Sequence, residues 1–165
     1  MTIKEEFGNL EGRHVVFVGD ANNVSRSLAI ACGKLGVRFT LACPEDYQFG
    51  EQEKQEIEAG CEGFRFSQIT NALQAVSDAD AIYTDVWASM GQEKEQKKRE
   101  QDFAAFQVNQ TLMQAAPESA IFLHCLPAKR GQEVTDEVMD GSQSRVVPQA
   151  GNRMHAQKGL LVWLL

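Results

Sequence analysis

The segment HCLP, at the end of an apolar run, places a histidine, a cysteine and a proline side by side. A proline there can hold a cis peptide bond, which is rare enough to indicate a turn of required shape. A cysteine nucleophile would need a histidine base, and no spacing ties His14 or His155 to Cys125. A buried thiol and a hydrogen-bonded core histidine are the simpler interpretation of Cys125 and His124.

Two further segments carry polar side chains directly after apolar runs. In GDANNV, two adjacent carboxamides offer donors and acceptors to an amino-acid head group, but Asn22 and Asn23 also suit a helix N-terminus, which is the simpler interpretation. In TDVWASMG, Asp85 precedes the hydroxyl of Ser89 by four positions. This pair could bind an ammonium group or cap a helix, and both interpretations stay open.

Arg153 lies near the start of the C-terminal segment NRMHAQKGLLVWLL, in which apolar residues recur at helical spacing. Its planar guanidinium could bind an anion in a nearby cleft or form a surface ion pair. The helix itself could equally serve only core packing.

The elements that position these residues alternate along the chain. Apolar runs rich in β-branched residues, typical of buried parallel strands, alternate with segments of helical spacing. Strands are expected at 14–19, 37–43, 63–67, 80–85 and 120–125, and helices at 22–36, 51–59, 71–79, 93–116 and 152–165. This order predicts an α/β domain, a three-layer doubly wound, Rossmann-like fold with a mainly parallel five-stranded sheet. Ligands of such folds bind at the carboxyl ends of the strands, where the polar segments lie.

Composition excludes several classes of function. The chain has 165 residues, of which 43% are hydrophobic and 24% charged, and this is typical of one folded domain. A net charge of -7 argues against nucleic acid or an anionic membrane as a partner. The run 93–102 has four acids and four bases, so we expect a solvated helix face there.

Other motifs are absent from the sequence. The segment GDANNV lacks the G-x-G-x-x-G fingerprint, which disfavours a nicotinamide-binding protein. The four cysteines show no metal or redox spacing, so we expect reduced thiols and no metal. Without a signal-peptide pattern or a long apolar run, we expect a cytoplasmic protein.

Taken together, TIKEEFG, FVGDANNVSRSLA, YTDVWASMGQE, HCLPAKRGQEVTDEVMDG and NRMHAQK resemble the ornithine carbamoyltransferase family, specifically its C-terminal amino-acid-binding domain. The resemblance covers essentially the whole chain. HCLPA with EVTDEV is specific to carbamoyltransferases, and SMG points to the ornithine rather than the aspartate branch. The resemblance implies transfer of a carbamoyl group from carbamoyl phosphate to the δ-amine of L-ornithine. The products are citrulline and phosphate, in arginine biosynthesis, and no cofactor is needed.

The resemblance also implies roles for individual residues. Asp85 and Cys125 lie beside the reacting groups and are assigned to catalysis. The backbone carbonyl of Leu126, turned inward by a cis bond to Pro127, accepts from the carbamoyl NH₂ group. The residues implied for ornithine are Asn23, Asp85, Ser89 and Met90, and those for carbamoyl phosphate are Cys125, Leu126 and Arg153.

The sequence also departs from the family pattern. The family's N-terminal domain, with its S-T-R-T-R phosphate loop and H-P-x-Q segment, has no counterpart in these residues. We therefore expect a single ornithine-binding domain over 1–165 that is inactive alone, or, alternatively, a stand-alone amino-acid-binding module without catalysis. Family homotrimers assemble mainly through the other domain. Near Arg153, Pro148 and Gly151 stand where acidic residues are usual.

Overall fold

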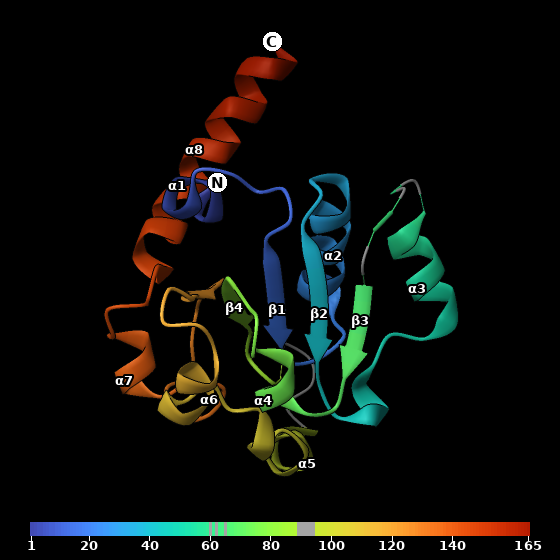
Figure 1. Ribbon diagram of the computed structural model, residues 1–165, viewed down its shortest axis with the longest axis vertical. Coiled ribbons are helices and arrows are strands. Elements are labelled where there is room, and N and C mark those ends of the chain that lie inside the picture. Colours follow the sequence, from blue (N-terminus) through green and yellow to red (C-terminus); the bar gives the residue numbers. More distant parts are fainter. Residues whose placement is uncertain (60, 62, 65, 89–94) are drawn as a thin grey trace.

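The computed structural model describes residues 1–59, 61, 63–64, 66–88 and 95–165. Five parallel strands form one sheet in the order β3-β2-β1-β4-β5 (Figure 1). The strands are β1 (His14–Val18), β2 (Arg38–Ala42), β3 (Phe66–Ile69), β4 (Ala81–Thr84) and β5 (Ile121–His124). The predicted fold class is confirmed. Strand order reverses between β1 and β4, so ligands of this topology bind beyond the carboxyl ends of these two strands.

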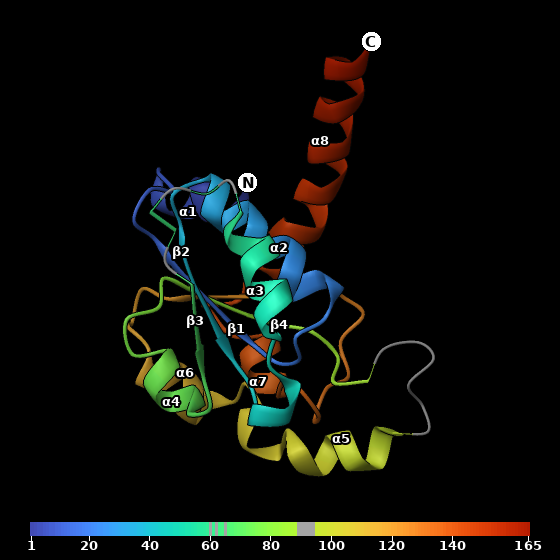
Figure 2. The same cartoon turned by 90° about the vertical axis from the view of Figure 1, so that its right-hand side faces the viewer.

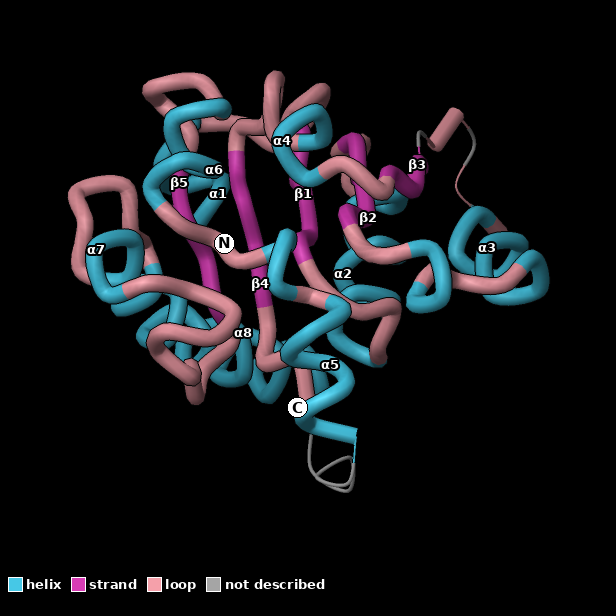
Figure 3. The backbone as a smooth tube through the Cα atoms, turned by 90° about the horizontal axis from the view of Figure 1, so that it is seen from below, coloured by secondary structure: helices cyan, strands magenta, loops and turns pink. Residues whose placement is uncertain are grey.

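Helices cover both faces of the sheet, with α2 and α8 on one side and α4 and α6 on the other (Figure 3). The helices are α1 (Thr2–Phe7), α2 (Asn23–Lys34), α3 (Glu51–Glu58), α4 (Ala72–Ala75), α5 (Gln96–Asp102), α6 (Gln110–Ala115), α7 (Asp136–Met139) and α8 (Val146–Leu164), with short 3₁₀ turns at η1 (Glu45–Tyr47) and η3 (Ala104–Phe106). No helix among the described residues is long and apolar enough to cross a membrane.

The core lies on both faces of the central strands. Residues 15–18 of β1 have no exposed surface, as expected for a parallel strand between two helical layers. Phe17 stacks on Tyr83 of the adjacent β4 with 5.5 Å between ring centroids. At the end of β1, Gly19 has φ 151°, and a Cβ there would lie 3.1 Å from the Phe17 ring. A side chain at this position is therefore disfavoured, both by the backbone conformation and by the close contact with Phe17.

One predicted helix, over 93–116, is wrong, because the structure has α5, η3 and α6 in its place. Phe103 and Phe106 turn into the core, with 0% and 6% exposure, and α5 ends before them at Asp102. Asn109 then starts α6 by accepting a hydrogen bond from the backbone of Leu112 at 3.0 Å.

The C-terminal helix α8 begins at Val146, six residues earlier than expected. Pro148 lies in its first turn, where the missing N–H costs no helical hydrogen bond. The first half of α8 contacts α1, and Asn152 Nδ2 donates to Thr2 Oγ1 at 3.0 Å. The second half projects away from the rest of the molecule (Figure 2).

Candidate functional site

The carboxyl ends of β1, β4 and β5 bring three predicted segments together around Asp85. This side chain is nearly buried, with the residue 9% exposed. Its Oδ1 accepts hydrogen bonds from Cys125 Sγ at 3.0 Å and from the backbone of Val86 at 2.8 Å. Its Oδ2 accepts from Asn22 Nδ2 at 3.3 Å. Asp85 therefore joins the loops after β1 and β5, and within the described residues it caps no helix.

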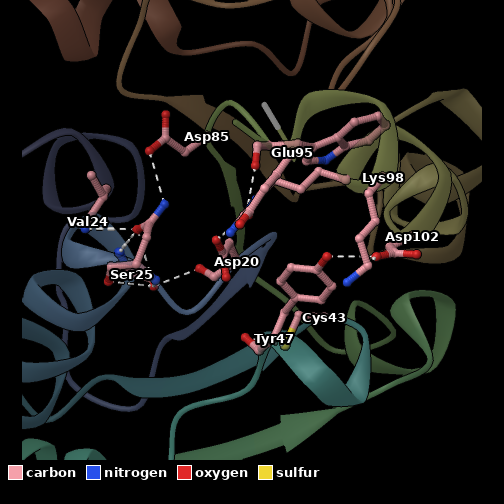
Figure 4. Close-up of polar contacts among 12 residues, drawn as sticks. Asp20, Val24, Ser25, Cys43, Tyr47, Asp85, Glu95, Lys98 and Asp102 are labelled. Carbon is pink, nitrogen blue, oxygen red and sulfur yellow. Dashed lines mark hydrogen bonds and ion pairs between the residues drawn. The ribbon is translucent and has the colours of Figure 1, made fainter. Parts of the chain in front are cut away.

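The two asparagines after β1 have different environments. Asn22 caps α2, because its Oδ1 accepts from the backbone of Val24 and Ser25, and Ser25 Oγ accepts from the Asn22 backbone at 2.9 Å (Figure 4). The capping interpretation is thus confirmed for Asn22, which also contacts Asp85. Asn23, the first residue of α2, is exposed and makes no side-chain hydrogen bond to the described part of the chain. Its carboxamide faces solvent.

Cys125 is a hydrogen-bond donor and not a thiolate. Burial, together with the hydrogen bond to Asp85 and its charge, raises the pKa of the Cys125 thiol to about 12. At neutral pH the thiol is therefore protonated. The ring of neighbouring His124 bonds to the backbone of Leu126 and to Glu133, so it is not a base for the sulfur. A covalent cysteine mechanism has no support from this geometry.

The turn after β5 contains the predicted cis bond between Leu126 and Pro127, which is confirmed. His124 Nδ1 accepts from the backbone of Leu126 at 2.8 Å, which leaves Nε2 to donate to Glu133 Oε1 at 3.2 Å. Glu133 Oε1 also accepts from the backbone of Lys129 at 2.6 Å. The buried pair of His124 and Glu133 therefore holds both ends of the turn that contains Leu126 and Pro127.

Sequence reasoning missed two residues that support this turn. Glu133 lies nine positions after His124, and the only signal for it was the acid in EVTDEV. Gln149 of α8 accepts from the backbone of His124 at 3.0 Å and donates to Tyr83 Oη at 3.1 Å. It therefore ties α8 to β4 and β5.

Arg153 lies on α8 beside Cys125, and both line two adjoining hollows. One has a volume of about 390 Å³ and includes Tyr83 and Gln149. The other has a volume of about 640 Å³ and includes Leu126 and Pro127. Within the described residues Arg153 has no ion pair, so the surface-pair interpretation is not supported. An exposed guanidinium at this opening suits an anionic ligand.

The other predicted ornithine residues, Ser89 and Met90, lie outside the described residues.

The charged run 93–102 is not wholly a solvated face, because Arg99 is buried. Its side chain is 8% exposed and pairs with Asp20, which follows β1, through Nη1 and Oδ2 at 2.5 Å. The same Nη1 donates to the backbone carbonyl of Trp87 at 3.0 Å, and the guanidinium lies 5.0 Å from the centre of the Tyr47 ring. Figure 4 shows Asp20 and Tyr47 in this cluster. The mixed charges of the run 93–102 predicted a solvent-exposed face, and they gave no sign that one member of the run, Arg99, would be buried.

Comparisons of the sequence and the fold with known proteins point to one family. A sequence profile of the family described as "Aspartate/ornithine carbamoyltransferase, Asp/Orn binding domain" matches residues 11–164. The chain is 46% identical over 165 residues to an ornithine carbamoyltransferase from Caldicellulosiruptor saccharolyticus, covering 99% of this chain and 54% of the relative. It is 49% identical over 167 residues to one from Pyrococcus abyssi, covering 100% and 53%. The chain thus spans about half the length of the curated relatives it matches.

Solved structures show the same likeness. The ornithine carbamoyltransferase structure from Pyrococcus furiosus has a TM-score of 0.90 and 49% identity, covering 97% of this chain and 52% of that one. The corresponding structure from Gloeobacter violaceus has a TM-score of 0.86 and 40% identity, covering 97% and 54%.

Proposed function

Since the chain belongs to the aspartate/ornithine carbamoyltransferase family and matches its Asp/Orn-binding domain, we propose that it binds L-ornithine for carbamoyl transfer. The junction of Asp85 with Cys125 and Asn22 carries this proposal, because it holds a carboxylate at the topological switch point beside an opening with a guanidinium. A carboxylate held in this way suits an ammonium group, and the nearby Arg153 suits an anion.

In the proposed reaction the neutral δ-amine of ornithine attacks the carbonyl carbon of carbamoyl phosphate. A C–N bond forms and gives a tetrahedral intermediate. The C–O bond to phosphate then breaks, the amine proton leaves with the phosphate, and citrulline is formed. The protonated thiol of Cys125 does not compete as a nucleophile. It donates to Asp85 and keeps that carboxylate oriented in the cleft.

The proposed roles come from the family resemblance, and the described positions of Asp85, Cys125 and Arg153 support them. Asp85 and the carboxamide of Asn23 bind the head group of ornithine, together with Ser89 and Met90. The carbonyl of Leu126, on the turn held by the buried pair of His124 and Glu133, accepts from the carbamoyl NH₂. Arg153 stabilises the negative charge on carbamoyl phosphate. The rate enhancement then comes from orientation and charge stabilisation.

We further propose that a second, carbamoyl phosphate-binding domain supplies most phosphate contacts. Of the two arginines that line the larger hollow, Arg130 is already paired with Asp136 and Asp140. One remaining guanidinium is too little charge to hold a phosphate dianion in place. Residues 1–165 alone are therefore expected to bind ornithine without forming citrulline.

The physiological setting is part of the same proposal. A relative from Pyrococcus furiosus is named an anabolic ornithine carbamoyltransferase, which supports a role in arginine biosynthesis. Four unpaired cysteines suit the reducing cytoplasm. The net charge of -7 disfavours nucleic acid and anionic membranes as partners. We propose a homotrimer, assembled mainly through the second domain.

The test is reconstitution. The 165-residue chain is mixed with a separately produced carbamoyl phosphate-binding domain of a close relative, and citrulline is measured. Neither part alone should form citrulline, and the mixture should. Robust turnover by the chain alone would contradict the two-domain proposal. Calorimetric ornithine binding without turnover in the mixture would favour a binding module without catalysis.

Asp85→Ala is the informative variant in this assay. It should abolish ornithine binding and citrulline formation, and the thermal midpoint should fall only modestly, because the carboxylate is proposed to contribute more to the ligand than its hydrogen bonds to Cys125, Asn22 and Val86 contribute to the fold. Asp46→Ala, which removes an exposed carboxylate on η1, is the matched control and should retain activity. A sharply lower midpoint for Asp85→Ala with unchanged affinity would mean that the carboxylate is only structural.

A further inference from the structure

Arg99 lies between loops that follow three different strands. Its Nη1 donates to Asp20 after β1 and to the carbonyl of Trp87 after β4, while its guanidinium faces the ring of Tyr47 after β2 (Figure 4). Glu95 adds a fourth contact, since Arg99 Nε donates to its Oε2 at 3.3 Å. A guanidinium this buried needs paired charge, and its planar fork can bond two loops in fixed directions.

Two of these loops carry the groups proposed to bind ornithine. The backbone carbonyl of Asp20 accepts from Ser25 Oγ at 2.9 Å, and Ser25 Oγ accepts from the Asn22 backbone at 2.9 Å. Asn22 in turn donates to Asp85, and Trp87 lies two residues beyond Asp85. Arg99 therefore holds both loops close to the Asn22–Asp85 hydrogen bond.

Other contacts already hold α5 on the body of the protein. Tyr47 Oη donates to Asp102 Oδ2 at 2.6 Å, and Phe103 is fully buried. The rings of Trp87 and Phe103 stack with 6.1 Å between centroids. These contacts do not involve the guanidinium, so α5 is expected to stay docked when Arg99 is replaced.

We propose that Arg99 is a positioning residue of the ornithine site. Through Asp20 and the carbonyl of Trp87 it fixes the spacing between Asn22 and Asp85, and so sets ornithine affinity without touching ornithine. This inference rests on the proposed function. The effect should fall mainly on ornithine, because Arg99 reaches Cys125 and the Leu126 turn only indirectly, through the hydrogen bond between Cys125 and Asp85.

The kinetic test uses the reconstituted enzyme with Arg99→Lys, Asp20→Asn and the double variant. Lysine keeps the positive charge of Arg99 but lacks the planar guanidinium that can donate to two loops in fixed directions. The KM for ornithine should rise about tenfold in each single variant, while kcat and the KM for carbamoyl phosphate change less than about threefold. The double variant should show little further increase, because both changes break one contact. The control Lys97→Gln, an exposed neighbour on α5, should match the unmodified enzyme.

An unchanged KM for ornithine in folded variants would overturn the proposal. The proposal would also be overturned if the KM for ornithine and the KM for carbamoyl phosphate rose by similar factors while kcat fell. A general structural defect would have that effect. Asp20→Asn tests the same contact if Arg99→Lys does not fold.

A second measurement does not depend on activity. The chain has two tryptophans, so Trp163→Phe leaves Trp87 as the only tryptophan, whose emission is isolated by selective excitation. Trp87 is 5% exposed, and its quenching by acrylamide should increase at least about twofold when Arg99→Lys is added, and not when Lys97→Gln is added. If the reconstituted enzyme without substitutions makes no citrulline, the proposed function has failed. The quenching measurement still tests whether Arg99 holds the loops after β1 and β4. Unchanged quenching would show that Arg99 does not hold them.

Discussion

The pairing of Cys125 with Asp85 sets the protonation of the only thiol in the candidate site. Burial has the largest effect on the Cys125 pKa, and the Asp85 carboxylate raises it further. Cys125, which donates to the Asp85 carboxylate, therefore keeps its thiol proton at neutral pH.

Asp85→Asn should lower the pKa of Cys125, because a neutral amide no longer disfavours the thiolate. Alkylation by iodoacetamide, followed at each cysteine by mass spectrometry from about pH 7 to about pH 11, measures this shift. The alkylation profile of Cys125 should move to lower pH. Cys32, whose pKa is raised by burial alone, is the internal control. An unmoved Cys125 profile would show that burial alone sets its pKa.

Single residues were predictable where a local motif marks them. Cys125, Asp85 and the cis bond before Pro127 were all found in short segments at strand ends, and the structure brings them together. The partners Arg99 and Asp20 were not found, because they are 79 residues apart and each has an ordinary solvent-exposed neighbourhood in sequence. Such a pair depends on how loops meet in three dimensions.

Among the elements, α8 contains two glycines that no close packing requires. A Cβ at Gly151 or at Gly159 would meet nothing within 4 Å. Gly151 lies in the half of α8 that contacts α1, whereas Gly159 lies in the projecting half. Substitutions at these two positions therefore distinguish a change in local helix stability from a change in the stability of the whole domain.

Gly151→Ala should raise the free energy of unfolding by about 0.5–1 kcal/mol, because alanine loses less backbone entropy in a helix. Urea denaturation followed by circular dichroism measures it. Gly159→Ala should increase helical signal but leave the urea midpoint nearly unchanged, since the projecting half frays without unfolding the core. Equal midpoint shifts for both variants would show that the whole of α8 unfolds with the domain.

Elements were predictable where burial is uniform. The strand β1 appears in sequence as an unbroken apolar run because both its faces are covered. The region 93–116 was not predictable, since Phe103 and Phe106 fit a helical spacing but are required by the core, which ends α5 early. Tertiary packing overrode a local preference there.

For the whole molecule, two buried thiols and the partly buried thiol of Cys125 make stability depend on pH in the alkaline range. The pKa values of Cys32, Cys43 and Cys125 are raised from 9.0 to about 12, mainly by burial. A raised pKa means that the folded state keeps protons which the unfolded chain loses. The associated stability is therefore complete below about pH 9 and is lost as the pH rises towards about 12.

Urea midpoints measured at increasing pH above about 9 should fall, and Cys32→Ala should make the fall shallower by up to about 1.4 kcal/mol per pH unit. Cys61→Ser, at a partly exposed thiol, is the control and should keep the original slope. A slope that Cys32→Ala leaves unchanged would assign the alkaline loss to other groups.

The projecting end of α8 exposes a large apolar surface. Leu161, Trp163 and Leu164 are 60%, 79% and 64% exposed, although the chain otherwise carries a net charge of -7. Surfaces of this kind mark sites of association. Size-exclusion chromatography with light scattering should show self-association of the full chain, and much less after truncation behind Lys158. Two equally monomeric and equally stable species would contradict this expectation.

The helix α8 connects two different places, because Gln149 at its base is bonded to the sheet and Trp163 near its end is exposed to solvent. Its base is tied to the backbone of His124 and to Tyr83, while its tip extends about 21 Å further at the usual helical rise. A tilt of about 5° at the base would move the tip by about 2 Å. If another surface holds Trp163 and so stops the projecting half of α8 from fraying, any tilt of that half is transmitted along the helix to Gln149 and Arg153.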